Sequence, residues 1–357
     1  MQKKYFKSKY IYIFKNTNNY YIRMNIFYTK TSKWEFDYFK NDIFDKNLYN
    51  IKINIIRFDD NTEIIDNNEH NIIITNNRIN INYIENMIKK IKPFIVFHLS
   101  DENGEDIKYY DLYSKYNIKL LFHQYNFKKI NYKINHFQIP LGYVSDFLSN
   151  NSYINSKQTE INKKYDFSFV GCVKSDRKEM LTKFYNNFEN NFIRTGMTYW
   201  TNLEKLNTKP RELFNIYKDT LFVPIGRGNA SLDCFRLYEA IVAGAIPVVC
   251  GSMEEINITF KFNKKKPYII VSDTWDKAVL LCKKMYDDKD KIYKIINSNN
   301  EWFQEQTINI SKKINELLPN TQSALDTPEA LVNSAAGKKK KKKNKKASEK
   351  AATENSS

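Results

Sequence analysis

Residues 221–250, LFVPIGRGNASLDCFRLYEAIVAGAIPVVC, constrain the fold of this chain more than any other segment. Their pattern predicts a buried strand, a loop broken by glycines, a helix, and a second apolar strand at residues 246–249. Parallel sheets covered by helices are built from units in this order. We therefore expect this segment to form half of a nucleotide-binding α/β domain.

The loop after the first predicted strand has the composition of a phosphate-binding turn. Gly226 and Gly228 flank Arg227, and a backbone without Cβ atoms can come close to a ligand. Ser231 is a typical N-cap residue, so we expect the helix to begin there with free amide groups in its first turn. These amides, the positive end of the helix dipole and the guanidinium would together attract phosphate.

The predicted helix carries Arg236 and Glu239, which are three residues apart and share a face. A carboxylate at this distance from a phosphate site is well placed to accept hydrogen bonds from the hydroxyls of a ribose. The other interpretation is an ordinary ion pair on a helix surface, which is common in proteins. The helical spacing leaves both interpretations open.

The segment RGNASLDCFRLYEAIVAGAIPVV, residues 227–249, resembles the signature of exostosin-type glycosyltransferases. In that family an arginine-glycine loop, an Arg-x-x-Glu-Ala helix and a Gly-x-Ile-Pro-Val strand follow one another in this order. The upstream DFSFVG, residues 166–171, followed by Arg177, is similar to the first strand and turn of the same domain. Trp275 and Trp302 lie about where the family carries tryptophans, so the resemblance covers residues 166–303.

This resemblance implies an α/β protein of the GT-B fold, in which two Rossmann-like domains face each other across a cleft. It also implies inverting transfer of a sugar from a nucleotide-diphosphate donor, a UDP-sugar, to a glycan hydroxyl, without a metal or other cofactor. The residues that would bind the donor are Gly171, Arg177, Arg227, Gly228, Ser231, Arg236 and Glu239.

Within this donor site, Arg227 and Arg236 would stabilise the departing diphosphate, and Glu239 would hold the ribose. Gly171 would permit a close turn after the first strand, which lets Arg177 reach a phosphate. An equally plain interpretation places Arg177 on a solvated first turn of a helix.

Strands and helices also alternate before residue 150. The pattern predicts strands at residues 10–14, 71–75, 93–99 and 119–123, and helices at residues 83–91 and 107–116. Alternation of this kind favours a parallel sheet covered by helices. A last helical region at residues 289–318 is expected to cross back onto the first domain, as the resemblance implies.

Acidic residues follow one of these strands in IVFHLSDENGED, residues 95–106. Ligands of open α/β sheets bind beyond the carboxyl ends of the strands, and an inverting transferase needs a general base near the acceptor hydroxyl. Asp101 and Glu102 are therefore the candidate catalytic residues. The alternative is that Ser100 and Asp101 cap a turn or helix and that His98 is a packed strand residue.

A similar position after the next strand is held by His123, Gln124 and Tyr125. They either touch the acceptor or the sugar, or they fill the core and its rim.

We expect four parts in the 357 residues. Residues 1–149 would form an acceptor-side Rossmann-like domain, the polar stretch 150–164 a linker, and residues 165–320 the nucleotide-sugar-binding domain. Residues 321–357 are a lysine-rich tail that we expect to be disordered, because it cannot bury enough apolar surface to offset its ordering entropy.

The net charge of +17 also suggests a rival function. Nine lysines and two glutamates lie in residues 338–357, so the tail is either a contact for an anionic membrane surface or polyanion, or a solvated low-complexity segment. The rival class is a basic nucleic-acid- or polyanion-binding protein on an α/β scaffold. A third possibility is a catalytically silent relative that binds glycans.

The remaining composition suggests a soluble protein in a reducing compartment. The four cysteines lack metal-ligand spacing, and no apolar run approaches the roughly 18 residues of a membrane span. Lysines interrupt the first residues, so no signal peptide is expected. Exostosins usually lie behind a membrane anchor, and this chain departs from that pattern. We therefore expect a cytoplasmic enzyme, such as one encoded by a large virus or a bacterium.

Overall fold

The structure, a computed structural model, describes residues 22–45, 48, 51–58, 70–127, 129–148, 162–196, 208–260 and 270–318. By its internal contacts the chain divides into a unit of residues 24–49 and 53–317 and a second unit of residues 1–23, 50–52 and 318–357. Almost all of the described residues belong to the first of these units. The predicted strand at residues 10–14 and the lysine-rich tail lie outside the described residues.

The first sheet has six strands in the order β2-β1-β3-β4-β5-β6. These strands are β1 (Ile22–Tyr28), β2 (Ile51–Arg57), β3 (Asn71–Asn76), β4 (Ile95–Leu99), β5 (Leu120–His123) and β6 (His136–Gln138). The pairs from β1 through β3, β4 and β5 to β6 are all parallel. Every residue of β3, β4 and β5 is buried, which is typical of parallel strands covered on both faces.

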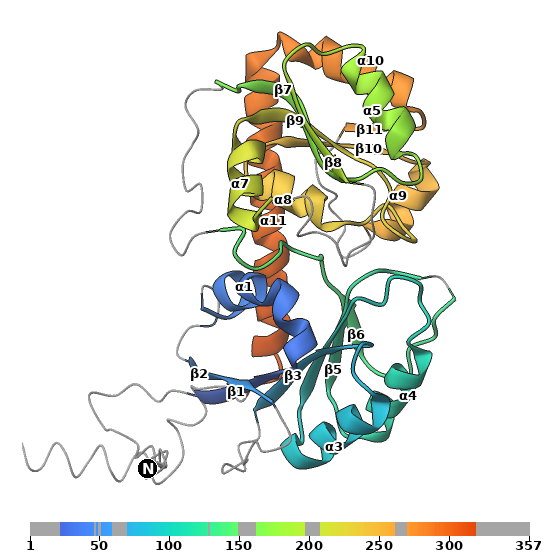
Figure 1. The fold of residues 1–357 in the computed structure, drawn as a ribbon. Coiled ribbons are helices and arrows are strands. Elements are labelled where there is room, and N and C mark those ends of the chain that lie inside the picture. Colours follow the sequence, from blue (N-terminus) through green and yellow to red (C-terminus); the bar gives the residue numbers. More distant parts are fainter. Residues whose placement is uncertain are drawn as a thin grey trace, which may run out of the picture. The chain divides into compact units, whose positions relative to one another are not determined.

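Helices α3 (Ile81–Ile91) and α4 (Ile107–Lys115) lie on the same face of this sheet (Figure 1). Ile84, Met87, Ile88 and Ile91 of α3 recur at helical spacing and pack in one hydrophobic cluster with Ile73 and Val96 of the sheet and with tyrosines of α4. Between β1 and β2 the chain forms η1 (Lys30–Glu35), α1 (Phe36–Tyr38) and η2 (Phe39–Phe44).

The second sheet has five strands in the order β11-β10-β9-β7-β8, and its neighbouring strands are parallel. Its strands are β7 (Tyr165–Cys172), β8 (Asn191–Gly196), β9 (Thr220–Ile225), β10 (Ile246–Cys250) and β11 (Ile270–Ser272). The helices of this part are α5 (Arg177–Tyr185), α7 (Pro210–Lys218), α8 (Phe235–Val242), α9 (Met253–Thr259), α10 (Trp275–Tyr286) and α11 (Lys289–Asn315).

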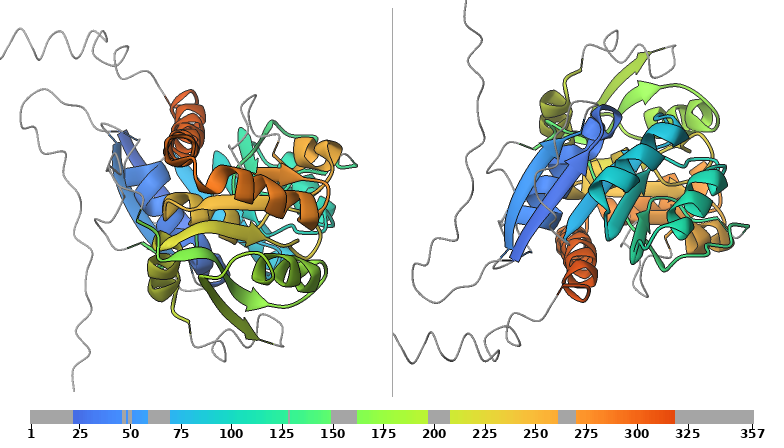
Figure 2. Two further views of the ribbon diagram at one scale, coloured as in Figure 1. Left: turned by 90° about the horizontal axis from the view of Figure 1, so that it is seen from above. Right: turned by 90° about the horizontal axis from the view of Figure 1, so that it is seen from below.

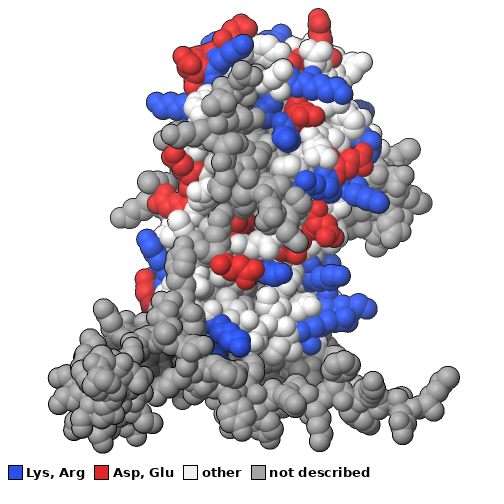
Figure 3. All heavy atoms as spheres, turned by 90° about the vertical axis from the view of Figure 1, so that its left-hand side faces the viewer, with Lys and Arg blue, Asp and Glu red and all other residues white. Residues whose placement is uncertain are grey.

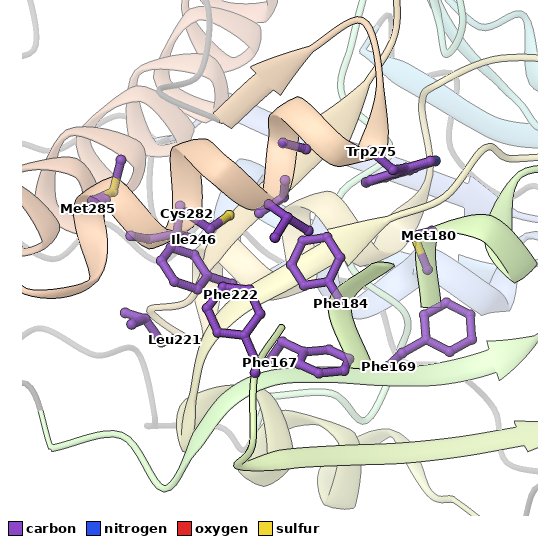
Figure 4. Packing of buried hydrophobic residues seen from close by; sticks show 14 of the residues in the cluster. Phe167, Phe169, Met180, Phe184, Leu221, Phe222, Ile246, Trp275, Cys282 and Met285 are labelled. Carbon is purple, nitrogen blue, oxygen red and sulfur yellow. The ribbon is translucent and has the colours of Figure 1, made fainter. Parts of the chain in front are cut away.

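Helices cover both faces of the second sheet, with α5 and α10 on one face and α7 and α8 on the other (Figure 1). On the first of these faces, Phe167 and Phe222 of the sheet pack with Phe184 of α5 and with Trp275 and Cys282 of α10 (Figure 4). Burial of each large apolar side chain contributes about 1.5–3 kcal/mol. This cluster therefore fixes α5 and α10 on the sheet. It also fixes the turns that precede these two helices.

The long helix α11, red-orange in Figures 1 and 2, packs against α8, α10 and η2. Ser311 Oγ donates to the backbone oxygen of Ile43, 2.9 Å away. The predicted return of the last helix onto the first part of the chain is thus confirmed at η2. None of the described helices combines the length and apolar character needed to cross a membrane.

The described strands and helices agree with the predicted α/β class and lie within two residues of most predicted bounds. The predicted helices at residues 83–91 and 107–116 correspond to α3 and α4, and the strand predicted at residues 166–171 to β7. The four cysteines are free thiols, as expected. The division into two domains at residues 150–164 stays a prediction, and residues 149–161 lie outside the described residues.

Candidate functional site

Three non-glycine residues with a left-handed backbone conformation come just after strands, at the carboxyl edges of the two sheets. Ser100 (φ 66°) follows β4, Tyr125 (φ 51°) follows β5, and Ser175 (φ 51°) follows β7. Non-glycine residues rarely adopt this conformation, and such strain is concentrated at functional sites. These strand ends are therefore the first place to look for a site.

At the end of β7, the side chain of Arg236 lies directly over Gly171. Arg236 Nε donates to the backbone oxygen of Val170 at 3.1 Å, and its guanidinium carbon lies 5.4 Å from the centre of the Phe169 ring. A Cβ atom on Gly171 would lie only 2.5 Å from Arg236 Nη2. Gly171 thus makes room for a guanidinium, so its role is to admit this side chain as well as to permit a turn.

Arg177 joins the loops that follow β7 and β9. It is 4% exposed, and its Nη1 and Nη2 donate to the backbone oxygens of Cys172 (2.9 Å) and Arg227 (2.6 Å). A Cβ on Gly226 would lie 2.3 Å from Arg177 Cγ, so this glycine gives the side chain its path. Burial and the nearby Arg236 lower the pKa of Arg177 to about 10. The interpretation of Arg177 as a solvated residue is therefore wrong.

The guanidinium of Arg227 is paired with a carboxylate that the sequence did not single out. Its Nη2 lies 2.6 Å from Glu255 Oε2, and its Nη1 contacts Glu255 Oε1, which makes a two-pronged ion pair. The side chains of Arg227 and Glu255 are 38% and 30% exposed. Glu255 lies in the first turn of α9, where its amide donates to the N-cap Ser252 Oγ at 3.1 Å. A phosphate that approaches Arg227 would have to compete with Glu255.

Asp176 connects the Arg227 loop to Trp275 through hydrogen bonds. Its Oδ1 accepts from the amide of Arg227 at 3.0 Å, and its Oδ2 accepts from Trp275 Nε1 at 3.2 Å. Trp275 is 2% exposed and belongs to the hydrophobic cluster of the sheet. The tryptophan thus acts through Asp176 to fix the backbone of the loop.

The prediction that Ser231 is the N-cap of the helix is wrong. Helix α8 begins at Phe235, and its N-cap is Cys234, whose backbone is extended (φ −156°, ψ 157°) and whose side chain makes no capping bond. Ser231 Oγ instead accepts from the amide of Asp233 at 3.2 Å.

The later start of α8 has a physical cause in the buried Asp233. Its Oδ1 accepts from Tyr238 Oη at 2.8 Å, which draws residue 233 back over the first turn. The backbone oxygen of Ser231 also accepts from the amide of Gly228 at 2.9 Å and closes the loop. At Gly228 a Cβ would lie 2.9 Å from the backbone oxygen of Asp233, so only glycine fits the closed loop without movement.

Glu239 is 3% exposed, and its Oε1 accepts from the amide of Val144 over a long 3.5 Å. Burial raises the pKa of Glu239 to about 7, against the opposing effects of Arg236 and of the Val144 amide. No ion pair within 4.0 Å joins Arg236 and Glu239 among the salt bridges of the described residues. The surface ion-pair interpretation is therefore wrong, and the ribose contact of Glu239 stays a prediction.

The two candidate bases after β4 lie in different environments. Asp101 is 2% exposed, its Oδ1 accepts from the Glu105 amide at 2.9 Å, and its Oδ2 accepts from Tyr110 Oη at 2.7 Å. Burial raises the pKa of Asp101. Both carboxylate oxygens thus hold a turn, as the capping alternative predicts. His98 is a packed strand residue, fully buried between Tyr113 Oη and Asp106 Oδ2, each 2.8 Å away.

Glu102 is connected to the basic side chains near β7 through a single asparagine. Asn229 Nδ2 donates to Glu102 Oε2, and Lys174 Nζ donates to Asn229 Oδ1. Burial, followed by Arg177, lowers the pKa of Lys174. Glu102 and Asn229 also line a polar pocket of about 200 Å³. Of the two candidate bases, only Glu102 has a side chain that reaches toward the residues expected to bind the donor.

A buried cluster supports the loop after β4. Glu35, at the end of η1, is 1% exposed, and burial raises its pKa to about 7 while a hydrogen bond with Gln124 opposes the shift. Gln124 Oε1 accepts from the amide of Ser100 at 2.9 Å. His123 and Tyr125 are buried as well, and burial lowers the pKa of His123 to about 4. The core-and-rim interpretation of residues 123–125 therefore describes their placement.

Sequence reasoning missed Lys174, Asn229, Glu255 and Glu35. Asn229 lies inside the arginine-glycine loop, so its position in that motif was a usable signal. Lys174 follows β7 by two residues, and this position is common for ligand contacts in α/β sheets. Glu255 and Glu35 come from segments without a motif, and only the fold brings them to the site.

Comparison with known families gives one match. Residues 146–322, just under half of the chain, match the family model described as the RXYLT1 C-terminal domain. The match contains the whole segment in which the exostosin-type signature was identified. No curated protein sequence matches the chain.

Solved structures match the chain at low identity. The Anabaena protein HepE in complex with UDP and glucose has 8% identity and a TM-score of 0.48, over 82% of this chain and 98% of its own. A Thermobaculum terrenum O-GlcNAc transferase mutant has 9% identity and a TM-score of 0.44, over 84% and 67%. The UDP-GlcNAc 2-epimerase of Neisseria meningitidis bound to UDP-GlcNAc has 9% identity and a TM-score of 0.44, over 82% and 98%.

The two parallel sheets with their covering helices agree with the GT-B-like class that the sequence predicts. The candidate site at the carboxyl ends of β7 and β9 includes the arginines and glycines that carry the exostosin-type signature. The predicted resemblance to exostosin-type glycosyltransferases is thus confirmed for residues 146–322, which match the RXYLT1 C-terminal domain, a member of the exostosin-like family.

Proposed function

We propose that the protein is a glycosyltransferase that moves a sugar from a UDP-sugar to a hydroxyl of a glycan, with inversion and without a metal ion. The observation that carries this proposal is a group of four cationic side chains beside the ends of β7 and β9. They are Lys174, Arg177, Arg227 and Arg236. Glu102 approaches this group through Asn229.

The cationic group has the chemistry that a departing diphosphate needs. Guanidinium and ammonium groups donate charge-assisted hydrogen bonds to phosphate oxygens, and fixed donors in a partly dry site stabilise developing negative charge. Arg236 is held by the backbone of Val170 and by the Phe169 ring, so its orientation is set before a ligand arrives. In this proposal the cations do the work that a bound metal does in other transferases.

In the reaction, the oxygen of the acceptor hydroxyl attacks the anomeric carbon of the donor sugar. The bond between that carbon and the diphosphate oxygen breaks, and UDP leaves with the electron pair. The hydroxyl proton passes to Glu102, the general base in this proposal. Attack from the face opposite the leaving group inverts the anomeric configuration. Glu239 would hold the ribose, which requires the donor to displace or accompany its contact with Val144.

Calorimetric titration of the full chain with UDP and a panel of UDP-sugars, near physiological salt, tests the donor site. Arg236→Ala should weaken UDP binding by about tenfold or more, because a charge-assisted bond to phosphate contributes about 1.5–3 kcal/mol. Arg211→Ala is the matched control: Arg211 also lies over an aromatic ring, 5.1 Å from Phe214, but on α7. It should leave UDP affinity unchanged.

Three outcomes would oppose the proposal. A folded protein that binds no UDP excludes the donor site. Equal, strongly salt-dependent binding of UDP, pyrophosphate and heparin favours a polyanion-binding protein. On the face shown in Figure 3, however, acidic side chains are interspersed among the basic ones of the described residues. UDP binding without turnover on any acceptor indicates a silent glycan-binding relative.

The inverting mechanism and the metal independence are tested in the enzymatic reaction itself. The anomeric configuration of the product, measured by proton NMR against that of the donor sugar, tests inversion. Activity that persists in excess EDTA tests metal independence. Retention of configuration, or loss of activity that Mg²⁺ or Mn²⁺ restores, contradicts the respective part.

A further inference from the structure

The polar pocket beside Glu102 is formed by the segments that follow β3 and β4, together with Asn229 from the loop after β9. It measures about 200 Å³, and its lining includes Asn77, Arg78, Asn103 and Glu105 in addition to Glu102 and Asn229. Pockets for drug-sized ligands measure about 300–1,000 Å³, so this one suits a smaller group. Its position beside Asn229 places it next to Lys174 and the other cations.

The floor of the pocket is rigidly held. Ser100 keeps its left-handed backbone (φ 66°) because Gln124 Oε1 accepts its amide. Asp101 closes the following turn through Glu105 and Tyr110. At Gly104 (φ 67°) a Cβ would lie 2.7 Å from the Phe127 ring, so the chain passes where only glycine fits. A pocket fixed in this way can bind without paying for loop ordering.

Several side chains on the rim still have hydrogen-bonding capacity to spare. Within the described part of the chain, the side chains of Arg78, Asn103 and Glu105 make no hydrogen bond or ion pair, although all three residues are exposed at the pocket. Amide and carboxylate groups that converge on a small cavity match the alternating donors and acceptors of hydroxyl groups.

The charge of the lining selects against anions. Asp101, Glu102 and Glu105 contribute three carboxylates, and Arg78 contributes the one cation among the lining residues. A phosphate or carboxylate on the ligand would meet net repulsion, whereas an uncharged sugar or polyol would not.

We propose that this pocket binds the terminal acceptor unit as an uncharged sugar or polyol, and that Asn103, Glu105 and Arg78 set this selectivity. The proposal rests on the glycosyltransferase function proposed above. It places the reacting hydroxyl against Glu102 and, through Asn229, beside the side chains that receive the donor diphosphate.

Saturation-transfer NMR on the full chain with UDP present is the test. The probes are the methyl glycosides of glucose, galactose, mannose and xylose, together with glucose 6-phosphate, galactose 6-phosphate and mannose 6-phosphate. We expect at least one neutral glycoside to bind with millimolar affinity and the phosphorylated sugars to bind at least fivefold more weakly. Asn103→Ala should weaken the neutral glycoside at least fivefold. Asn82→Ala, an exposed asparagine on α3, is the matched control and should change nothing.

Glu105→Gln isolates the charge effect, since it removes one negative charge and keeps hydrogen-bonding groups. It should strengthen binding of the phosphorylated sugars several-fold relative to binding of the neutral glycosides. The proposal is overturned if only phosphorylated sugars bind, if no sugar binds, or if Asn103→Ala leaves neutral binding intact. UDP affinity, measured on the same samples, distinguishes failure of the pocket proposal from failure of the donor-site proposal. Loss of glycoside binding with UDP bound refutes this pocket alone, whereas absence of UDP binding refutes the donor site.

Discussion

Gly171 lies beneath the guanidinium of Arg236, and a methyl group on this glycine would lie 2.5 Å from Arg236 Nη2. The two residues belong to different elements, β7 and α8, and are brought together by the parallel sheet. The glycine therefore serves the position of a cation that is proposed to meet the diphosphate.

Gly171→Ala should displace the Arg236 side chain, weaken UDP binding several-fold, and destabilise the protein by about 1–3 kcal/mol through overpacking. A double-mutant cycle with Arg236→Ala separates contact from backbone effects. If the clash is the cause, Gly171→Ala costs less stability in the Arg236→Ala background. Equal costs in both backgrounds, measured by denaturant unfolding, would assign the effect to the backbone of residue 171.

The pairing of Arg227 with Glu255 predicts a gain of function from a conservative change. Glu255→Gln removes the negative charge that competes with phosphate for this guanidinium, so UDP should bind about two- to tenfold more tightly at low salt. The gain should shrink as the ionic strength is raised. Unchanged UDP affinity in calorimetry, with a normal melting temperature, would show that Arg227 serves only the structure of the loop.

Replacing each candidate base should separate catalysis from structure. Glu102→Gln should lower kcat by about 10²–10⁴-fold and leave UDP affinity nearly unchanged, because it removes only proton transfer. Asp101→Asn should mainly lower stability, since both oxygens of Asp101 accept hydrogen bonds in a buried turn. Initial rates with a fixed UDP-sugar, beside thermal unfolding of both variants, give the comparison. Full activity in Glu102→Gln would require another base.

From the burial of Glu239 we expect the free energy of unfolding to fall as the pH rises. Burial raises its pKa from 4.5 to about 7, so the folded state holds this proton more tightly than the unfolded state. The favourable contribution is complete below the unfolded pKa and is lost as the pH rises through 7. Glu35 and Asp233, whose pKa values burial also raises to about 7, act in the same direction.

Between about pH 5 and pH 8, the wild-type protein should therefore lose stability, and Glu239→Gln should lose about 1–3 kcal/mol less. Urea unfolding at a series of pH values measures this difference. Glu301→Gln, an exposed substitution on α11, provides the control. A Glu239→Gln profile parallel to the wild type would mean that Glu239 is ionised in the folded protein across this range.

The second sheet was predictable because its strands are unusually explicit in the sequence. The apolar runs at β9 and β10 are separated by a helix with small residues, and glycines mark both turns. The start of α8 was missed because capping preferences consider only residues that are adjacent in sequence. The buried bond between Asp233 and Tyr238 instead shifts the helix start to Phe235.

The first sheet was only partly predictable. β2 reads IKINIIR and is mostly half-exposed, so its asparagine and lysine obscure the strand pattern. The candidate site was also only partly predictable from the sequence. The arginines and glycines of the signature follow from local sequence, whereas Glu255 and Lys174 are selected by contacts across 28 and 55 residues.

Asn229 carries a further consequence for how the protein can be produced. With Ala230 and Ser231 it forms Asn-Ala-Ser, the acceptor sequence for N-linked glycosylation in a secretory pathway. A glycan would be attached to the amide nitrogen that donates to Glu102, and its bulk would stand between that carboxylate and Lys174. If Glu102 is the base as proposed, an active preparation needs Asn229 unmodified, so a bacterial host is the suitable source.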